Sequence, residues 1–189
     1  MHRILNIAGN ENNNVDLIEH PKADFIFITS VKADINIISD LIEDKEFLLF
    51  QDNFRALEIS NLNTFAQIDN YFLKTINYAK IVVLRLFGDK GTWSYGLEQL
   101  IKWKEVNLNK TLLILSGTDE EDLSLNELSS VDLDTSLKIS KLLKSGGKEN
   151  YRRFLYCLSY LSSNETNIPQ KYISNVSYPD PYQYDWKNE

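Results

Sequence analysis

The residues with the clearest capacity for chemistry lie where one apolar run ends and the next segment begins. The stretch from Ile81 to Leu100 reads IVVLRLFGDKGTWSYGLEQL and predicts a buried strand, a glycine turn and the start of a helix. Junctions between strand and helix are where open α/β sheets bind their ligands. We therefore expect a ligand site at this junction. Its candidate substrate-binding residues are Arg85, Gly88, Lys90, Gly91, Trp93 and Tyr95.

Arg85 is the first of these candidates, because it interrupts an otherwise apolar strand. A charge in such a strand is costly unless it has a partner. A guanidinium that lines a cleft would bind a carboxylate through two parallel hydrogen bonds. Alternatively, Arg85 forms an internal ion pair with an acidic residue such as Asp69 or Glu98. The sequence leaves both interpretations open.

The glycine turn from Gly88 to Gly91 has two interpretations as well. Backbone amides at such a turn, together with a helix N-terminus, favour anions, and Lys90 would add positive charge. Glycines are also common wherever a chain turns tightly, and this plainer reading is favoured. Gly91 and Gly96 have the spacing of the two P-loop glycines, but Leu-Glu follows where Lys-Ser/Thr is required. The sequence therefore contains no Walker A motif here.

Trp93 and Tyr95 stand where the predicted helix begins. Their rings could stack on a flat ligand. Aromatic residues at such positions more often fill the gap between the first turn of a helix and the sheet, so packing is the favoured interpretation.

Metal ligands and catalytic groups are sparse in the rest of the chain. The run Asp119–Asp122 could hold a hard cation, although a solvated acidic loop is the favoured reading. His2, His20 and Cys157 are far apart in sequence, and no His/Cys ligand spacing occurs. We expect Cys157 to be a small packing residue of the last helix. No Ser-His-Asp pattern, nucleophile elbow or pair of catalytic carboxylates is found, so no catalytic residue and no metal ligand is assigned.

Composition limits the class of protein. The chain has 189 residues, which suits one domain of ordinary size, and 43% of them are apolar. Its net charge of −7 argues against binding to nucleic acid or to anionic lipid. One cysteine allows no internal disulfide, which fits a reducing compartment. With no secretory signal and no stretch of about 20 apolar residues, we expect a cytoplasmic protein without a membrane partner.

Strand-like and helix-like segments alternate along the chain, which predicts a doubly wound, mostly parallel α/β sheet of the Rossmann or flavodoxin kind with helices on both faces. The predicted strands are Arg3–Ala8, Asp24–Thr29, Glu46–Phe50, Arg55–Ile59, Ile81–Phe87 and Thr111–Leu115. The predicted helices carry apolar stripes over Ile35–Ile42, Phe65–Ala79 with Asn63 as N-cap, Leu97–Ile101, Asp132–Lys144 before a Gly-Gly stop, and Tyr151–Leu161.

The periodic pattern ends after Leu161. The remaining segment carries prolines at positions 169, 179 and 181 among polar residues and scattered aromatics. We therefore expect an α/β head domain over residues 1–162, followed over residues 163–189 by an extended linker or tail.

Several segments occur in the same order as in a known family. They are ADFIFITS at Ala23–Ser30, AQIDNY at Ala66–Tyr71, VVLRLFGDKGTWSYGLEQL at Val82–Leu100, LILSGT at Leu113–Thr118, LSSV at Leu128–Val131 and GGKEN at Gly146–Asn150. Together they resemble the N-terminal region of CobN, the large subunit of ATP-dependent cobaltochelatase, a family similar to the H subunit of magnesium chelatase. The block with Arg85, Gly88, Gly91, Trp93 and Tyr95 is its most specific part.

The resemblance implies a role in cobalamin biosynthesis. The family's complex inserts Co²⁺ into the tetrapyrrole hydrogenobyrinic acid a,c-diamide, and two AAA-type subunits hydrolyse the ATP. The absence of a P-loop here agrees with that division of labour, so we expect Co²⁺ and ATP to be used by the parent complex and no cofactor to be bound by this chain. The family's large subunit is several times longer, so this chain resembles an amino-terminal fragment whose tail leads towards a missing chelatase body.

Two other functions remain open. The chain could be a non-catalytic interaction module that packs against the rest of a chelatase subunit, in which case it should expose a contiguous apolar patch. It could also be a flavodoxin-like binder of a small molecule. As part of a chelatase subunit, the isolated chain is expected to perform no turnover alone, because its sequence shows no complete active site.

Overall fold

The computed structural model describes residues 17–118, 123–163, 165 and 167–177. The strand expected at Arg3–Ala8 and the acidic run Asp119–Asp122 lie outside these residues, as does the last part of the predicted tail.

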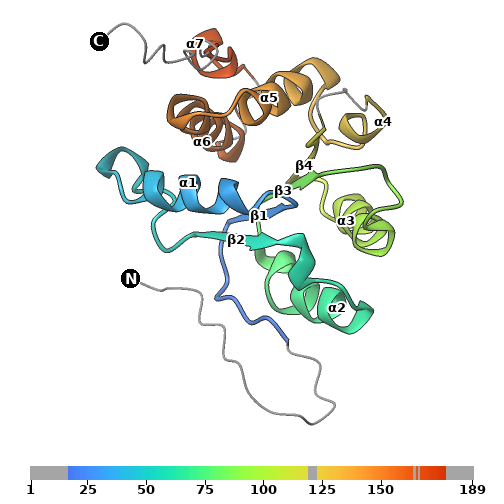
Figure 1. Cartoon of the computed structure of the whole chain (residues 1–189). Helices are drawn as coiled ribbons and strands as arrows, with labels where there is room; N and C mark the ends of the chain where they lie inside the picture. The colour runs from blue at the N-terminus through green and yellow to red at the C-terminus, as the bar shows by residue number, and fades with distance from the viewer. Residues whose placement is uncertain (1–16, 119–122, 164, 166, 178–189) are drawn as a thin grey trace, which may run out of the picture.

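Four parallel strands form one sheet in the order β2-β1-β3-β4. Their bounds are β1 Phe25–Thr29, β2 Phe54–Glu58, β3 Ile81–Leu86 and β4 Thr111–Ser116. The chain passes from β1 outward to β2, crosses back over β1 to β3, and continues outward to β4 (Figure 1). This is the predicted doubly wound α/β fold, and the continuous apolar runs of β1, β3 and β4 are its buried strands.

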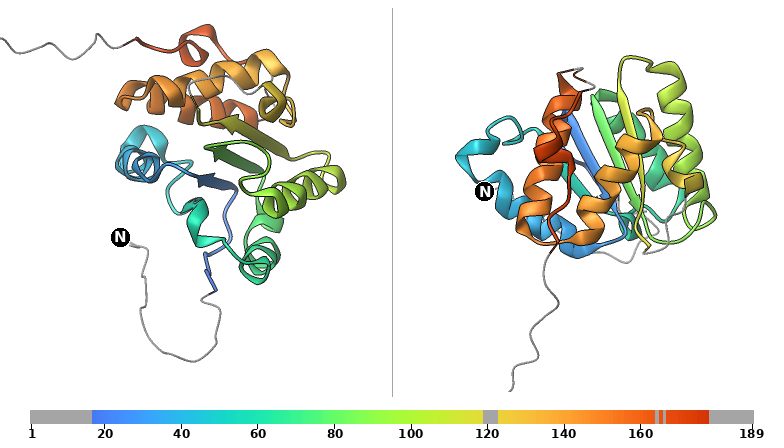
Figure 2. Two further views of the ribbon diagram at one scale, coloured as in Figure 1. Left: turned by 45° about the vertical axis from the view of Figure 1, so that its right-hand side comes forward. Right: turned by 90° about the horizontal axis from the view of Figure 1, so that it is seen from above.

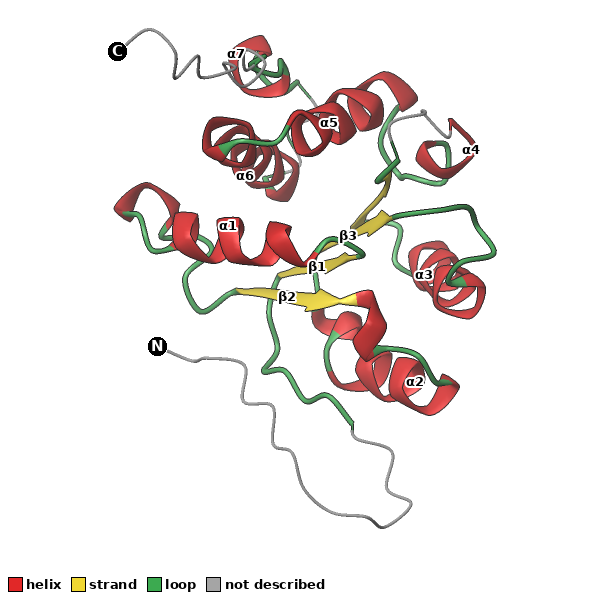
Figure 3. Ribbon diagram, in the orientation of Figure 1, coloured by secondary structure: helices red, strands yellow, loops and turns green. Residues whose placement is uncertain are grey.

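Helices connect and follow the strands (Figure 3). The α-helices are α1 Lys32–Ile42, α2 Phe65–Lys74, α3 Ser94–Val106, α4 Leu123–Asn126, α5 Leu133–Ser145, α6 Lys148–Ser162 and α7 Gln170–Ile173; the short 3₁₀ helices are η1 Lys45–Phe47, η2 Ile59–Asn61 and η3 Ile76–Tyr78. Among the described residues, no helix combines the length and the apolar character needed to cross a membrane.

Local capping explains where the helices begin and end. Thr64, one residue after the predicted cap, closes a capping box with Gln67 at the start of α2. Asp132 accepts a hydrogen bond from the Thr135 amide at the start of α5. That helix ends at Gly146, whose φ of 63° lies in the left-handed region that glycine adopts without strain.

The sheet separates two layers of helices (Figures 1 and 2). Helices α1, α5 and α6 cover one face, and α2 and α3 cover the other. Because successive side chains of a strand point to opposite faces, Val83 belongs to the first hydrophobic core and Val82 to the second. Both faces are therefore buried, as expected for a parallel sheet.

The outer edge of β4 is closed by side chains rather than by another strand. Ser130 bonds the amide and carbonyl of Leu112, and Ser129 does the same for Ile114. Two residues further on, the Ser116 amide donates to Asn126 Oδ1, and the Ser116 carbonyl accepts a hydrogen bond from Ser140 Oγ. These contacts satisfy the outward polar groups of the edge strand, which would otherwise pair with another chain.

The prediction of a strand at Glu46–Phe50 is wrong. Residues 45–47 form the 3₁₀ helix η1 and a turn follows. The apolar residues Phe47 and Phe50 are spaced by three positions, so both reach the core, where the ring of Phe50 contacts those of Phe25 and Phe54. The next strand was predicted one residue late, at Arg55–Ile59.

The reading of the segment after residue 162 as unpacked is also wrong for its described part. Ile168 and Ile173 are buried in the core beside α6. Arg153 donates to the Ser174 carbonyl at 2.7 Å, and Asn150 bonds both the amide and the carbonyl of Val176. These isolated anchors carry no periodic pattern, which is why the sequence did not reveal them. The division into a head domain and a tail stays a prediction.

Candidate functional site

The carboxyl ends of β1 and β3 form the expected ligand edge. The chain leaves these two neighbouring strands in opposite directions, and this is the position where open α/β sheets bind ligands. The two strand ends are tied together, because the Ser30 amide donates to the Arg85 carbonyl at 2.9 Å and the Phe87 amide donates to Ser30 Oγ at 3.1 Å. The six candidate residues follow from β3 at this edge.

Arg85 is buried in a polar cluster beneath α1 and α6. Its Nη1 donates to Asp34 Oδ1 at 2.6 Å and lies 3.4 Å from the hydroxyl of Tyr151. The Tyr151 hydroxyl donates to the same carboxylate oxygen, and Thr29 Oγ1 donates to the other at 2.8 Å. Asp34 is fully buried and Arg85 is 6% exposed.

This cluster supports the internal ion pair rather than an open cleft for Arg85. The partner differs from both candidates considered, since it is Asp34 of α1 instead of Asp69 or Glu98. Burial and the hydrogen bond to Asp34 raise the pKa of Tyr151 above its ordinary value, so its hydroxyl keeps the proton it donates. The guanidinium Nε has no hydrogen-bond partner among the described residues, so the short contact of Nη1 to Asp34 is the main polar contact of Arg85. A buried carboxylate with three donors is well satisfied.

The turn from Gly88 to Gly91 is largely exposed, and the carboxylate of Asp89 within it already binds one of its backbone amides. Gly88 has a φ of 104°, a conformation that side chains rarely adopt, so glycine is required for the turn itself. The Gly91 amide donates to Asp89 Oδ1 at 2.8 Å. An anion at this amide would have to displace a carboxylate, while Lys90 is exposed beside it.

Trp93 and Tyr95 lie on the opposite face of the sheet from the Arg85 side chain. The indole of Trp93 is buried, and its Nε1 donates to the Leu62 carbonyl at 2.9 Å. This confirms packing for Trp93. Tyr95 is half-buried, and its hydroxyl donates to Asp69 at 2.6 Å. Its ring lies tilted against the exposed ring of Phe65, with 4.5 Å between the ring centroids.

The six residues thus lie at one edge of the sheet, but their side chains do not point towards a common site. Arg85 points into the α1 and α6 layer, Trp93 and Tyr95 into the α2 and α3 layer, and the glycine turn lies outside. Contact between any of the six and a substrate stays a prediction.

Sequence reasoning missed three members of the polar cluster: Thr29, Asp34 and Tyr151. A usable signal existed for Asp34, because it shares a helical face with Ile38 and Leu41, where an acidic residue is costly without a partner. Tyr151 was expected as an apolar stripe residue, and the pattern gives no sign of where its hydroxyl points.

In the described part of the chain, no three His, Cys, Asp or Glu side chains are placed so that they could hold a metal ion. Cys157 packs inside α6, with Sγ 3.6 Å from the Tyr172 carbonyl, and burial raises the pKa of its thiol to about 12. Its expected packing role is confirmed.

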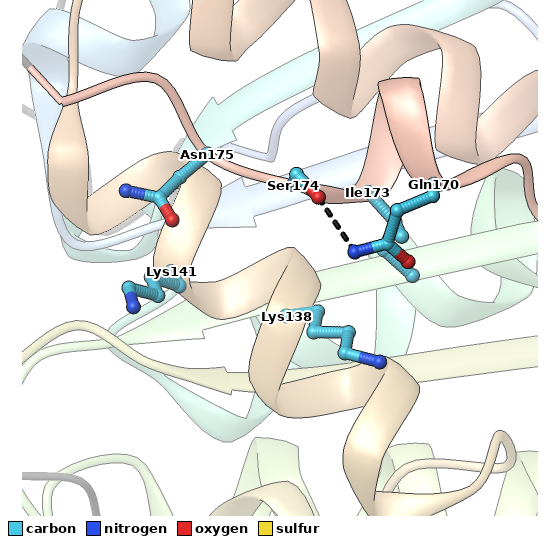
Figure 4. A pocket seen from close by; sticks show the side chains of 6 residues that line it. All are labelled: Lys138, Lys141, Gln170, Ile173, Ser174 and Asn175. Atoms are coloured by element: carbon cyan, nitrogen blue, oxygen red, sulfur yellow. Dashed lines mark hydrogen bonds between the residues drawn. The ribbon is translucent and has the colours of Figure 1, made fainter.

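A shallow hollow of about 180 Å³ lies between α5 and α7 (Figure 4). Lys138 and Lys141 reach it from α5, and Gln170 Nε2 donates to Ser174 Oγ at 2.7 Å on the other side. None of the six candidate residues lines this hollow, so it is separate from the carboxyl edge of the sheet.

Curated relatives give the chain its family context. An aerobic cobaltochelatase subunit CobN from Pseudomonas aeruginosa is 30% identical over 111 residues, which make up 57% of this chain and 9% of that protein. A CobN subunit from a Sinorhizobium species is 26% identical over 175 residues, 90% of this chain and 13% of that protein. The resemblance to the N-terminal region of CobN is confirmed. No protein-family model matches the chain.

A solved structure shows the same fold. The catalytic subunit of cobaltochelatase from Mycobacterium tuberculosis superposes on 84% of this CobN-like chain with a TM-score of 0.59 and 20% identity. The chain covers 12% of that structure, as it covers 9% and 13% of the two curated CobN relatives. It therefore corresponds to a small part of each of these proteins.

Proposed function

We propose that this chain serves as the N-terminal α/β domain of a cobaltochelatase large subunit, within a complex that inserts Co²⁺ into hydrogenobyrinic acid a,c-diamide. The observation that carries the proposal is the match to a CobN subunit over 90% of this chain. ATP hydrolysis would belong to AAA-type partner subunits, because the sequence here has no P-loop. The remainder of the large subunit would hold the macrocycle and the metal.

Within that complex, we assign the chain a packing and docking role rather than a catalytic one. Arg85 Nη1 and Trp93 Nε1 already have hydrogen-bond partners inside the fold. Of the six candidate residues, those with accessible side-chain groups are Lys90 and Tyr95, too few to orient a polycarboxylated macrocycle by themselves. The domain would therefore support a substrate site that lies mainly in the larger part of the subunit.

Complementation tests the role in the complex. The experiment uses the Pseudomonas CobN from which the segment aligned with this chain has been removed, together with its partner subunits, Co²⁺, ATP and the corrinoid. Addition of the 189-residue chain should restore the spectral change of cobalt insertion. No gain in activity, at a chain concentration that saturates binding to the shortened CobN, would contradict the proposal.

A second measurement tests the docking role. The corrinoid is titrated into the isolated chain while its absorbance is followed. We expect no spectral shift up to high micromolar concentration. A saturable shift that is lost in Lys90→Ala would instead place an autonomous substrate site at the glycine turn.

A further inference from the structure

The amino ends of the strands carry an exposed apolar patch on the side of α2 and α3. We name it the amino-end patch, and it consists of Leu73, Tyr78, Val106 and Leu108. Their exposed fractions are 64%, 49%, 81% and 82%, far above what such side chains show in a covered surface. Large exposed apolar groups that gather at one place indicate a docking surface.

The topology brings these four side chains to one end of the molecule. Helices α2 and α3 run side by side, antiparallel to the strands, so both end near the first residues of β3 and β4 (Figure 1). Lys110 Nζ, at the start of β4, donates to the Asn77 carbonyl of η3 at 2.8 Å. This bond ties the turn that carries Leu108 to the one that carries Tyr78.

Positive charge surrounds the patch, in contrast to the net charge of −7 of the whole chain. Among the described residues of the segments around the patch, the lysines are Lys22, Lys74, Lys80, Lys104 and Lys110, and the carboxylates include Glu19, Asp24 and Glu105. Lys22 Nζ lies 3.7 Å above the ring of Tyr78, which places one ammonium on the patch itself. Asp24 neutralises only Lys80, at 2.7 Å.

One of these lysines, Lys104, also holds the backbone of the patch in place. Lys104 Nζ donates to the carbonyls of Asn107, Leu108 and Lys110, which caps the end of α3. These bonds use carbonyl oxygens, which carry no net charge, so the positive field of the lysine remains. The backbone that presents Leu108 is thereby held in one conformation before any partner arrives.

From this geometry we infer that the amino-end patch docks an acidic protein surface with an apolar centre, supplied by the remaining part of a cobaltochelatase large subunit. The inference rests on the proposed function, because that remainder is the partner with which this domain would always be associated. Val106 and Leu108 would enter the apolar centre of the partner surface, and the lysines would face its carboxylates. Complementary charge would set the register, and the apolar contacts would supply most of the affinity.

Binding to the shortened Pseudomonas CobN tests the patch. Its affinity for the 189-residue chain is measured by titration calorimetry at low and high salt, for the wild-type chain and for variants. Val106→Asp with Leu108→Asp should weaken binding by about tenfold or more. Lys22→Glu with Lys74→Glu should weaken it at low salt and reduce its salt dependence.

Leu48→Asp is the matched control. Leu48 is 65% exposed and lies between α1 and β2, on the other side of the sheet, so its replacement should change affinity by less than about twofold. Amide hydrogen exchange gives an independent readout, since residues 73–78 and 104–110 should gain protection in the complex. Unfolding midpoints of all variants verify that these surface substitutions leave the domain folded.

The outcomes separate this inference from the proposed function. Restored cobalt insertion with an unimpaired Val106→Asp/Leu108→Asp chain would overturn the patch and leave the function standing. Patch-dependent binding without restored activity would overturn the function and leave the patch standing. Equal weakening by Leu48→Asp, no binding at all, or preferential binding of phosphatidylserine vesicles through the same lysines would overturn the patch.

Discussion

The two faces of the sheet are closed by different chemistry around the end of the same strand. Towards α1 and α6, Arg85 meets the fully buried Asp34 and the Tyr151 hydroxyl. Towards α2 and α3, Trp93 fills the space with an apolar ring and makes one hydrogen bond, to Leu62. Arg85 and Trp93 are eight positions apart in the sequence and were predicted to belong to one site, but their side chains lie on opposite faces of the sheet.

The difference shows where this fold is sensitive. A charged cluster is stable only while all of its members are present, because each buried ion depends on the others. On the aromatic side, the loss of folding stability should grow with the volume of the cavity or clash that a substitution creates, because packing energy is spread over many contacts. Substitutions on the two faces should therefore differ in size and in how they can be compensated.

The largest effect is expected for Asp34→Ala. It would leave the Arg85 guanidinium buried without its carboxylate, at a cost of about 3–5 kcal/mol in the free energy of unfolding. Urea denaturation measures this cost. The double replacement Asp34→Leu with Arg85→Met should recover most of it, because an apolar pair needs no desolvation. A single-variant cost below about 1 kcal/mol would mean that water reaches the cluster.

Tyr151→Phe removes one donor from the same carboxylate and leaves the ion pair in place. We expect a loss of about 1.5–3 kcal/mol, typical of a hydrogen bond to a charged group. The measurement is again urea unfolding, combined with Asp34→Ala in a double-mutant cycle. Strict additivity of the two costs would show that the hydroxyl and the carboxylate do not interact.

Gly96→Ala tests the aromatic face. A Cβ at this position would lie 2.3 Å from ring atoms of Trp93, so the indole must shift, at a cost of about 1–3 kcal/mol. Gly146→Ala is the control. Its φ of 63° strains any side chain, but an added Cβ would have no neighbouring atom within 4 Å, so the substitution tests backbone strain without a steric clash. This backbone strain should cost about 1–3 kcal/mol and leave the near-ultraviolet signal of tryptophan unchanged.

Sequence reasoning predicted the fold well because its strands are buried on both faces. The continuous apolar runs of β1, β3 and β4 are typical of strands covered on both faces. It failed at residues 46–50, where Phe47 and Phe50 are apolar for tertiary reasons and the local pattern is too short to separate a turn from a strand.

The candidate site was predicted only as a location. The strand-to-helix junction after Arg85 does lie at the expected edge of the sheet. The sequence alone did not indicate towards which face of the sheet each side chain points. Alternation along β3 sends Arg85 towards α1, and hence towards Asp34, whereas both predicted partners lie on the α2 and α3 side. A pairing between residues so far apart in sequence can be predicted only once the order of the strands and the placement of the helices are known.

A smaller effect should appear with acid on the α2 and α3 side. His20 contacts the Tyr71 hydroxyl at 2.9 Å, and burial lowers the pKa of His20 from 6.5 to about 4. The folded state thus disfavours the protonated ring, while the unfolded chain takes up the proton below pH 6.5. Stability should therefore fall as pH drops from 6.5 to 4, by about 1–2 kcal/mol. In His20→Gln, urea midpoints should lose this part of their pH dependence; an unchanged profile would contradict the assignment.

The smallest effect is expected for Tyr95→Phe, which pairs with the Tyr151 variant. Both tyrosines donate a hydroxyl to an aspartate, but the bond from Tyr95 to Asp69 lies at the surface. Water replaces an exposed hydrogen bond almost without loss, so the urea midpoint should not change measurably. The hydrogen bond to Asp69 raises the pKa of Tyr95, and an Asp69→Asn variant should return that titration towards 10 without altering stability. A clear loss of stability in Tyr95→Phe would mean that the aromatic face, like the charged one, depends on a polar contact.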